Sequence, residues 1–471
     1  MNHIQNLCHN INRACNCRAL MVRANQLVAI ILFAALAFGD DTQDKALQVK
    51  KCLIKHDCLN HPTSWMDFKN NLPSCFITHR IWWSNKTEGI PITLVTQLSS
   101  ERLEQLNAQC RTWRGPLAAV VYLSLFSPSR GRLTEQNRLA LEQVNARIDL
   151  LFKSSEGNRT TGCQLRLAFM YEVFADSRAA MALYPVNSLR NYARLMADTD
   201  LIANIDVDML PSASFSAALA NSQILTNYST TCRARAVYVL PAFTALCGDK
   251  QLADSLAATG DKEAIRKALQ GCLRVFAYHK PIFHGPTQFE KWLNTRDVYS
   301  VTYALNYEPW YVSWRFWTTW YDFRYRGYGN NKIVQVAAMN ATGTVWLVSP
   351  HGFLVHRPHD STLMRNEYVR VKTATIDRSH LRGTIYEHVE SLWTDMQAEL
   401  MNGTYVAPIE PGVQSCLESL PWWQSGLQQR GQVPKLQQQQ GLRSGLAREQ
   451  QLQKLWQEQL QEIQEWQQEQ Q

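Results

Sequence analysis

The stretch Ile92–Leu98, ITLVTQL, followed by Ser99–Trp113, SSERLEQLNAQCRTW, decides the fold. Its first part is rich in β-branched residues and ends in polar ones, which is typical of a buried strand. The second part carries apolar residues at helical spacing behind a capping serine. Outward from this pair, strands are predicted at Pro116–Leu125, Leu165–Tyr171 and Leu201–Ile205, and helices at Leu133–Phe152 and Pro185–Met196. This alternation predicts an α/β fold in which a mostly parallel, mixed sheet carries helices on both faces.

The composition of the 471 residues excludes two broad classes of protein. With 45% hydrophobic and 19% charged residues, the chain can bury a core and is not wholly disordered. The net charge is +8, but no long run of Lys and Arg concentrates it, which argues against nucleic acid as a partner.

An apolar segment near the start predicts entry into the secretory pathway. Leu27–Phe38, LVAIILFAALAF, is an uncharged run of twelve residues, the length of a signal-peptide core and shorter than the ~20 residues that span a bilayer comfortably. It fits either a cleaved signal peptide or a short signal anchor that leaves residues 1–26 in the cytosol.

Glycosylation motifs and cysteines agree with this compartment. Five Asn-x-Ser/Thr sequons occur, at Asn85, Asn158, Asn227, Asn340 and Asn402. Nine of the twelve cysteines follow the apolar run, and none of these nine forms a CxxC pair, so disulfides are favoured over a zinc site. Because nine is odd, at least one thiol stays free or pairs with another chain.

The chain divides into a few regions by composition. Residues 39–75 are predicted to be a stem, and residues 76–423 to form the α/β domain. Residues 424–471 hold 19 glutamines in 48 positions and are predicted to be either disordered or an amphipathic helix that could support self-association.

The chemical centre is predicted in Leu201–Ser212, LIANIDVDMLPS. In an extended conformation, Asp206 and Asp208 would point to one face, at the carboxyl end of a strand, where α/β sheets bind ligands. Two carboxylates suit Mg²⁺ or Mn²⁺, which neutralise a departing diphosphate. A second pair, Asp198 and Asp200, precedes the same strand at its other end and is predicted to form a turn. The pattern alone leaves a solvated strand end as the alternative for Asp206 and Asp208.

Eight segments then follow in the order found in a known family. They are ITLVTQLSSERLEQL, WRGPLAAVVYL, YPVNSLRNYAR, ANIDVDMLPS, FHGPTQFEKW, YEPWYV, RGYGNNK and GFLVHRPH. Across about residues 76–360 the chain resembles glycosyltransferase family 49, which includes β-1,4-glucuronyltransferase and the second catalytic domain of LARGE-type xylosyl/glucuronyltransferases. The resemblance implies a GT-A fold, a UDP-sugar donor, Mn²⁺ dependence and a Golgi membrane location with a lumenal catalytic domain; secretion after signal cleavage is the alternative.

The resemblance also implies roles for single residues. Donor-binding residues are expected in the first strand and in the helix before the aspartates, with a histidine from FHGPTQFEKW: Thr96, Gln97, Arg190, Asn191 and His284. Strand-end capping is an equal alternative for Thr96 and Gln97. Arg190 is expected to pair with a phosphate or with Asp206, and a surface salt bridge stays open. GFLVHRPH supplies the third metal ligand, His356, with His359 as the second choice.

An inverting transferase needs a carboxylate as general base. Glu308 and Asp322 are the acidic residues of the matching blocks, whereas Asn330 and Asn331 leave the loop after RGYG without an acid. The neighbouring aromatic residues are predicted to form a sugar-stacking wall or to pack in the core.

The sequence therefore predicts an inverting, metal-dependent glycosyltransferase with one catalytic domain. It would move glucuronate or xylose from UDP-glucuronate or UDP-xylose to a glycan or glycoprotein acceptor. A catalytically silent, lectin-like glycan-binding protein is the alternative, and a metal-dependent hydrolase is a weaker third.

Overall fold

The computed structural model describes residues 41–55, 64–72, 75–87, 89–128, 132–157, 162–246, 248–362, 364–366, 368–369 and 384–424. The chain divides into two units, Met1–Leu47 and Gln48–Gln471. The predicted signal segment, the Asn158 sequon and residues 425–471 of the tail lie outside the described residues. Among the helices that are described, none has the length and apolar character needed to cross a membrane.

The main sheet has nine described strands in the order β1-β4-β3-β2-β5-β11-β7-β12-β10. Their bounds are β1 Ile77–Trp83, β2 Ile92–Ser99, β3 Pro116–Phe126, β4 Gln164–Phe174, β5 Leu201–Asn204, β7 Ala236–Leu240, β10 Tyr299–Val301, β11 Trp310–Trp314 and β12 Val345–Val348. Strands β4, β3, β2 and β5 run parallel, whereas β1, β11 and β10 are antiparallel to their neighbours. The predicted α/β class is confirmed, but the parallel character is confined to this block and to the pair β7–β12, so the sheet is more evenly mixed than the sequence pattern predicted.

The helices are α3 Asp41–Ile54, α4 Trp65–Lys69, α5 Leu103–Thr112, α6 Glu135–Gly157, α7 Ser177–Ala182, α8 Val186–Leu195, α9 Ala213–Leu219, α10 Ser222–Arg233, α11 Lys250–Thr259, α12 Lys262–Leu269, α13 Pro281–His284, α14 Phe289–Asn294, α15 Ile333–Ala341, α17 Ile385–Met401 and α18 Pro411–Ser419, with short 3₁₀ turns η1 Ser100–Arg102 and η2 Gly285–Thr287. Every element predicted from the sequence between Ile92 and Ile205 is present, with ends shifted by a few residues.

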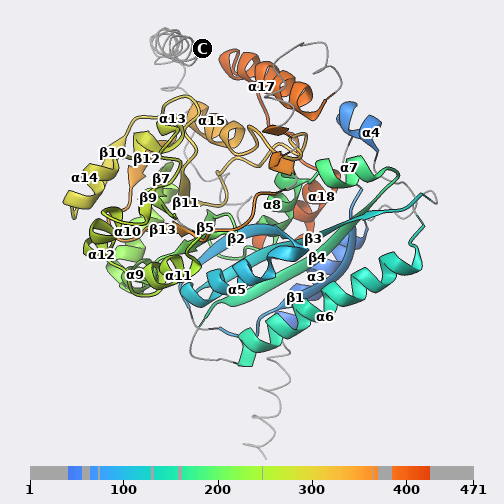
Figure 1. Ribbon diagram of the computed structural model, residues 1–471, viewed down its shortest axis with the longest axis horizontal. Helices are drawn as coiled ribbons and strands as arrows, with labels where there is room; N and C mark the ends of the chain where they lie inside the picture. The colour runs from blue at the N-terminus through green and yellow to red at the C-terminus, as the bar shows by residue number, and fades with distance from the viewer. Residues whose placement is uncertain are drawn as a thin grey trace, which may run out of the picture. The chain divides into compact units, whose positions relative to one another are not determined.

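Two faces of the sheet are covered by different crossover helices. The connections β2-α5-β3 and β3-α6-β4 advance toward one edge, whereas the connection through α8 returns from β4 to β5. Because parallel crossovers are right-handed, α8 lies on the face opposite α5 and α6. Figure 1 shows α5 and α6 in front of β2, β3 and β4.

A second sheet, β6-β13-β8-β9, adjoins the turn that follows β5. Its strands are β6 Met209–Pro211, β8 Ala242–Ala245, β9 Leu273–Val275 and β13 Leu354–His356. In this sheet His356 lies opposite Met209 on one side and Thr244 on the other. The register therefore brings the GFLVHRPH segment beside the aspartate segment, although the two are 150 residues apart in the chain.

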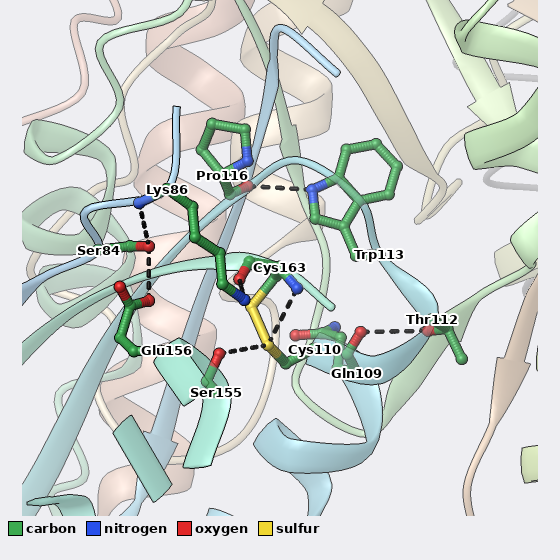
Figure 2. The surroundings of a disulfide bond; sticks show 10 residues. All are labelled: Ser84, Lys86, Gln109, Cys110, Thr112, Trp113, Pro116, Ser155, Glu156 and Cys163. Carbon is green, nitrogen blue, oxygen red and sulfur yellow. Dashed lines mark hydrogen bonds between the residues drawn. A yellow bond between two sulfur atoms is a disulfide. The ribbon is translucent and has the colours of Figure 1, made fainter. Parts of the chain in front are cut away.

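Two disulfides confirm the predicted use of the cysteines. Cys110–Cys163 joins the end of α5 to the start of β4, with Ser155 and the backbone N–H of Cys163 contacting Cys110 Sγ (Figure 2). Cys52–Cys416 joins α3 to α18. Cys232 is a buried thiol without a disulfide partner, and burial raises its pKa.

The second disulfide also changes the predicted boundary of the stem. Val49, Cys52 and Leu53 are buried, and Gln48 already belongs to the larger unit. Part of the segment predicted to be a stem is therefore packed into the same compact unit as the α/β sheet, because apolar residues on one side of α3 are covered.

Candidate functional site

The aspartates at the centre of the site lie in a turn between two sheets. The backbone N–H of Met209 donates to the carbonyl of Asp206 at 2.9 Å, which closes a turn over residues 206–209. The side-chain amide of Gln109 in α5 donates to the carbonyls of Asp206 and Met209 at 3.1 and 2.9 Å and so holds both ends of this turn. The expectation that Asp206 and Asp208 extend from one face of a strand is wrong, because the chain turns to pass from β5 into β6.

Asp208 lies in a cluster with His356 and His359, and the three offer ligand atoms within 4.8 Å of one another. Nε2 of His359 is 2.8 Å from Asp208 Oδ2, and Nε2 of His356 is 3.9 Å from the same oxygen. The other ring nitrogen of His359 contacts the carbonyl of Asp360 at 2.7 Å, and that of His356 contacts Thr244 Oγ1 at 3.2 Å. Both histidines thus aim Nε2 at the carboxylate, which is the orientation that metal-binding histidines adopt.

Asp206 lies outside this cluster and is held by cations instead. Its Oδ1 accepts from Arg190 Nη2 at 2.8 Å, and its Oδ2 is 3.3 Å from Lys332 Nζ and 3.1 Å from Trp310 Nε1. Burial alone would raise the pKa of Asp206, but Lys332 and Arg190 outweigh it and hold that pKa well below the ordinary value. Of the two alternatives for Arg190, the structure has the pairing with Asp206.

Lys332 connects Asp206 to a second carboxylate. Its Nζ is 3.2 Å from Glu308 Oε1, and it lies 3.8 Å from the centre of the Trp310 ring. The Lys332 side chain is 6% exposed and that of Glu308 is 30% exposed, so the cation is buried while the carboxylate reaches the surface. Of the two candidate bases, Glu308 is the one beside the aspartates.

The other residues predicted to bind the sugar donor differ in their surroundings. Thr96 is buried in β2, and Gln97 next to it accepts a hydrogen bond from the hydroxyl of Tyr184; both lie in the carboxyl-terminal half of the strand. His284 stacks on Trp310, with ring centres 5.1 Å apart. Burial and then the charge of Lys332 lower the pKa of His284 well below its ordinary value, so this ring is neutral.

Two predicted site residues are structural. Asn191 is completely buried and donates to the carbonyl of Tyr321 at 2.7 Å while accepting from its N–H at 3.0 Å, so both ends of its amide are used. The Asp322 side chain has no exposure and accepts from Arg324 Nη2 at 2.7 Å and from the Tyr405 hydroxyl at 3.1 Å. The prediction of Asp322 as a general base is therefore wrong, because no acceptor substrate can reach a fully enclosed carboxylate.

The expected aromatic wall is also largely core. Tyr311, Trp314 and Tyr321 are buried, and Trp320 packs at a tilt against Trp423. Trp310 alone of this group touches the aspartates. All five residues of β11 are buried, because this strand lies between β5 and β7 inside the sheet, which is why an aromatic-rich strand does not offer a row of exposed rings.

The sequence pattern missed two cations of the site. Lys332 ends the RGYGNNK block, but a single lysine gives no signal of which carboxylate it meets. Arg102 lies in η1 after β2, and its Nη1 is 3.2 Å from Asp208 Oδ2. Its place directly after the first strand, at the same sheet edge as Asp208, was the available clue.

Residues 91–393 match the family described as glycosyl-transferase for dystroglycan. The chain belongs to this glycosyltransferase family. The match covers β2 through α17 and so includes every residue of the site described above. The resemblance predicted from the eight segments is confirmed.

The curated relatives match over more than half of this chain but over only about a third of their own length. The chain is 30% identical over 273 residues to the human xylosyl- and glucuronyltransferase LARGE2, covering 58% of this chain and 33% of that protein. It is 28% identical over 271 residues to the glycosyltransferase-like protein gnt14 of Dictyostelium discoideum, covering 58% and 38%. The chain therefore spans about a third of the length of the curated relatives it matches.

Among solved structures, this chain is similar to that of S. aureus TarS in complex with UDP-GlcNAc. The identity is 11% and the TM-score 0.29, over 71% of this chain and 79% of that chain. Likeness at this TM-score says nothing about ligands, and the chemistry of the site rests on its own residues.

Proposed function

We propose that the chain is a metal-dependent, inverting glycosyltransferase that moves glucuronate or xylose from a UDP-sugar to a glycan acceptor. The observation that carries the proposal is the cluster of Asp208, His356 and His359 at the sheet edge. The partly exposed carboxylate of Glu308 is connected through Lys332 to Asp206, two residues before Asp208. A metal site for a leaving group and a base for an acceptor are the two parts that such a transfer needs.

The ligand atoms of this cluster suit a divalent cation. One carboxylate oxygen and two imidazole nitrogens suit Mn²⁺ and also accept Mg²⁺, and each imidazole is oriented by a partner at its other nitrogen. We assign Asp208, His356 and His359 as ligands, with His359 promoted from second choice and Asp206 removed from the set. When bound, the ion would supply positive charge for the diphosphate of the leaving nucleotide.

The protein's own residues supply the remainder of the chemistry. Arg190 and Lys332 hold Asp206 and keep positive charge beside the place where the diphosphate develops its charge. Glu308, held by Lys332, is the residue assigned to accept the proton of the attacking acceptor hydroxyl. Gln97, partly exposed in the carboxyl-terminal half of β2, is assigned to the nucleotide, whereas the side chain of Thr96 beside it is buried.

The compartment and partners follow from the same proposal. We place the protein in the Golgi membrane, anchored through Leu27–Phe38, with a glycan or glycoprotein as acceptor. The glutamine-rich tail is proposed to support self-association. The sequons at Asn85, Asn227 and Asn402 have exposed asparagines, which suits glycosylation in the secretory pathway.

A catalytically silent glycan-binding protein is the alternative. It would have no need for Asp208, His356 and His359 to converge, nor for a carboxylate held at the surface by a buried lysine. Both features favour the enzyme.

The test is a panel of UDP-sugars assayed for transfer to glycan acceptors, with and without Mn²⁺. We expect transfer with UDP-glucuronate or UDP-xylose, and loss of transfer on chelation. Glu308→Gln should remove transfer while keeping UDP binding, whereas Glu142→Gln, at an exposed position of α6, should change neither. UDP binding without transfer of any sugar would favour the silent glycan-binding protein.

A further inference from the structure

Arg102 forms an ion pair with Asp208, the carboxylate that the proposed metal site requires. It is the last residue of η1, between β2 and α5, and its side chain is 17% exposed. Its Nη1 is 3.2 Å from Asp208 Oδ2 and its Nη2 is 3.3 Å from His359 Nδ1. One guanidinium therefore touches two of the three assigned ligands.

The contacted oxygen is the same one that both histidines face. Asp208 Oδ2 lies 2.8 Å from His359 Nε2 and 3.9 Å from His356 Nε2. A guanidinium has five donors and no acceptor, so it can neither coordinate a cation nor share this oxygen with one without repulsion. A divalent ion that uses Asp208 Oδ2 thus requires Arg102 to withdraw.

With the two histidines left aside, the formal charges around the site are balanced before any ligand binds. Three carboxylates, Asp206, Asp208 and Glu308, face three cations, Arg102, Arg190 and Lys332, through the contacts given above. A divalent cation alone adds positive charge to this balanced set, and a diphosphate alone adds negative charge. The two together restore the balance, and a guanidinium released from Asp208 finds a bidentate partner in a phosphate.

We propose that Arg102 couples metal binding to nucleotide binding. It neutralises Asp208 in the ligand-free protein and moves to the diphosphate of the nucleotide when the metal takes its place. This inference rests on the proposed function, because it assumes the metal site assigned there. By thermodynamic linkage, UDP then raises the affinity for the metal by the same factor as the metal raises the affinity for UDP.

The test measures Mn²⁺ binding directly, from the electron paramagnetic resonance signal of free Mn²⁺, with and without UDP. In the unaltered protein UDP should raise the Mn²⁺ affinity about tenfold or more, within the usual range of coupling between two sites. Arg102→Met should bind Mn²⁺ without UDP about three- to tenfold more tightly, and UDP should then raise its Mn²⁺ affinity by a smaller factor than in the unaltered protein, with only the direct attraction between ion and diphosphate left. Arg102→Gln, which also lacks the charge, should behave alike. Arg111→Met, at an exposed position of α5, is the matched control and should behave as the unaltered protein.

The outcomes separate this inference from the proposed function. If Mn²⁺ does not bind to the unaltered protein, either with UDP or without it, the assigned metal site is wrong and both proposals fall. If Mn²⁺ and UDP bind independently of each other to the unaltered protein, there is no coupling and this inference falls while the proposed metal site stands. If they bind cooperatively but Arg102→Met and Arg102→Gln keep the full cooperativity of the unaltered protein, or lose Mn²⁺ affinity without UDP, Arg102 is not the coupling residue and the proposed function stands.

Discussion

Asp206 and Asp208 are two residues apart and yet meet different surroundings. Asp206 is neutralised by the buried cations Arg190 and Lys332, whereas Asp208 faces two imidazoles and a partly exposed arginine. The turn closed by Asp206 and Met209 separates their directions. The first aspartate organises the cations, and the second is left to receive a ligand.

Substitution of Asp208 tests this division. Asp208→Asn should remove Mn²⁺ binding and lower transfer by more than the roughly 10–100-fold that loss of a supporting residue costs at a metal site. Asp206→Asn should lower transfer but keep Mn²⁺ binding, because its partners are Arg190 and Lys332. Titration of Mn²⁺ beside an assay of transfer checks both; Mn²⁺ binding that depends on Asp206 but not on Asp208 would reverse the assignment.

The pair at the other end of β5 provides the control. Asp200 pairs with Arg233, and the two side chains are 40% and 53% exposed, so Asp200→Asn should change stability by at most about 0.5 kcal/mol and leave transfer intact. Asp198 pairs at 2.5 Å with Arg166, which is only 7% exposed, so Asp198→Asn should destabilise the fold by about 3 kcal/mol without affecting Mn²⁺ affinity.

Among the elements, α8 carries most of the polar support for the site. All ten of its residues are buried, and its polar side chains bind the backbone of the segment that follows β11. Asn187 donates to the carbonyls of Asp322 and Asn331, and Arg194 to those of Arg315, Thr318 and Thr319. The helix thereby fixes the segment that ends in Lys332.

Asn191 of α8 tests this supporting role. Asn191→Ala leaves the N–H and carbonyl of Tyr321 without partners, so it should lower the free energy of unfolding by about 2–4 kcal/mol. The affinities for UDP and Mn²⁺ should change less than about twofold. Urea unfolding beside ligand titration measures both. A loss of UDP affinity at unchanged stability would restore the role in donor binding that was first expected for this residue.

Helices and strands were predictable where apolar residues repeat at helical spacing or form a continuous apolar run. β2, β3 and β4 are apolar strands, α5 and α6 have apolar stripes, and each was predicted to within a few residues. The turn at Asp206–Met209 was not, because an Asp-x-Asp triplet fits an extended strand as well as a turn. The burial of Asn191 and Asp322 was missed for a similar reason: polar residue types indicate exposure until their partners, which lie far away in the sequence, are known.

Across the whole molecule, the segment 410–424 holds distant parts together. Leu420, Trp422 and Trp423 are buried, and the indoles of both tryptophans donate to the carbonyl of Leu195 at the end of α8, at 2.9 and 3.1 Å. Glu410 is buried at the start of α18, near Arg326, Glu172 and Ser188. No pattern in residues 39–75 revealed that Cys52 meets Cys416.

Glu410 should make stability depend on pH. Burial, together with the charge of Glu172, raises its pKa to about 7, and Ser188 and Arg326 do not offset this. The folded state therefore binds this proton more tightly than the unfolded state, so the contribution of Glu410 to stability is most favourable below about pH 4.5 and falls by ~3 kcal/mol as pH rises to about 7. Glu410→Gln should remove most of this fall in urea unfolding, and Glu418→Gln, exposed on α18, should not. An unchanged pH profile in Glu410→Gln would show that the group is ionised throughout.

Truncation tests where the folded unit ends. Deleting residues 425–471 should leave UDP binding and transfer intact, because the matched family segment and the assigned site lie before them. Deleting residues 420–471 also removes three buried apolar side chains and should cost about 5 kcal/mol or more. Thermal unfolding and transfer assays of the two truncations measure the difference; equal stability would show that the tryptophans are dispensable.

The Cys52–Cys416 disulfide also determines how the protein carries mechanical load. Its cysteines are 364 positions apart, so a pull applied outside them passes from Cys52 to Cys416 through one covalent bond. The closed loop between them contains the sheet and the assigned site. The force bypasses this loop, so the loop bears no tension. Reduction of that bond puts the loop under tension and makes roughly 100–110 nm of additional chain length available to stretch, because the Cys110–Cys163 disulfide inside the loop keeps 53 positions closed.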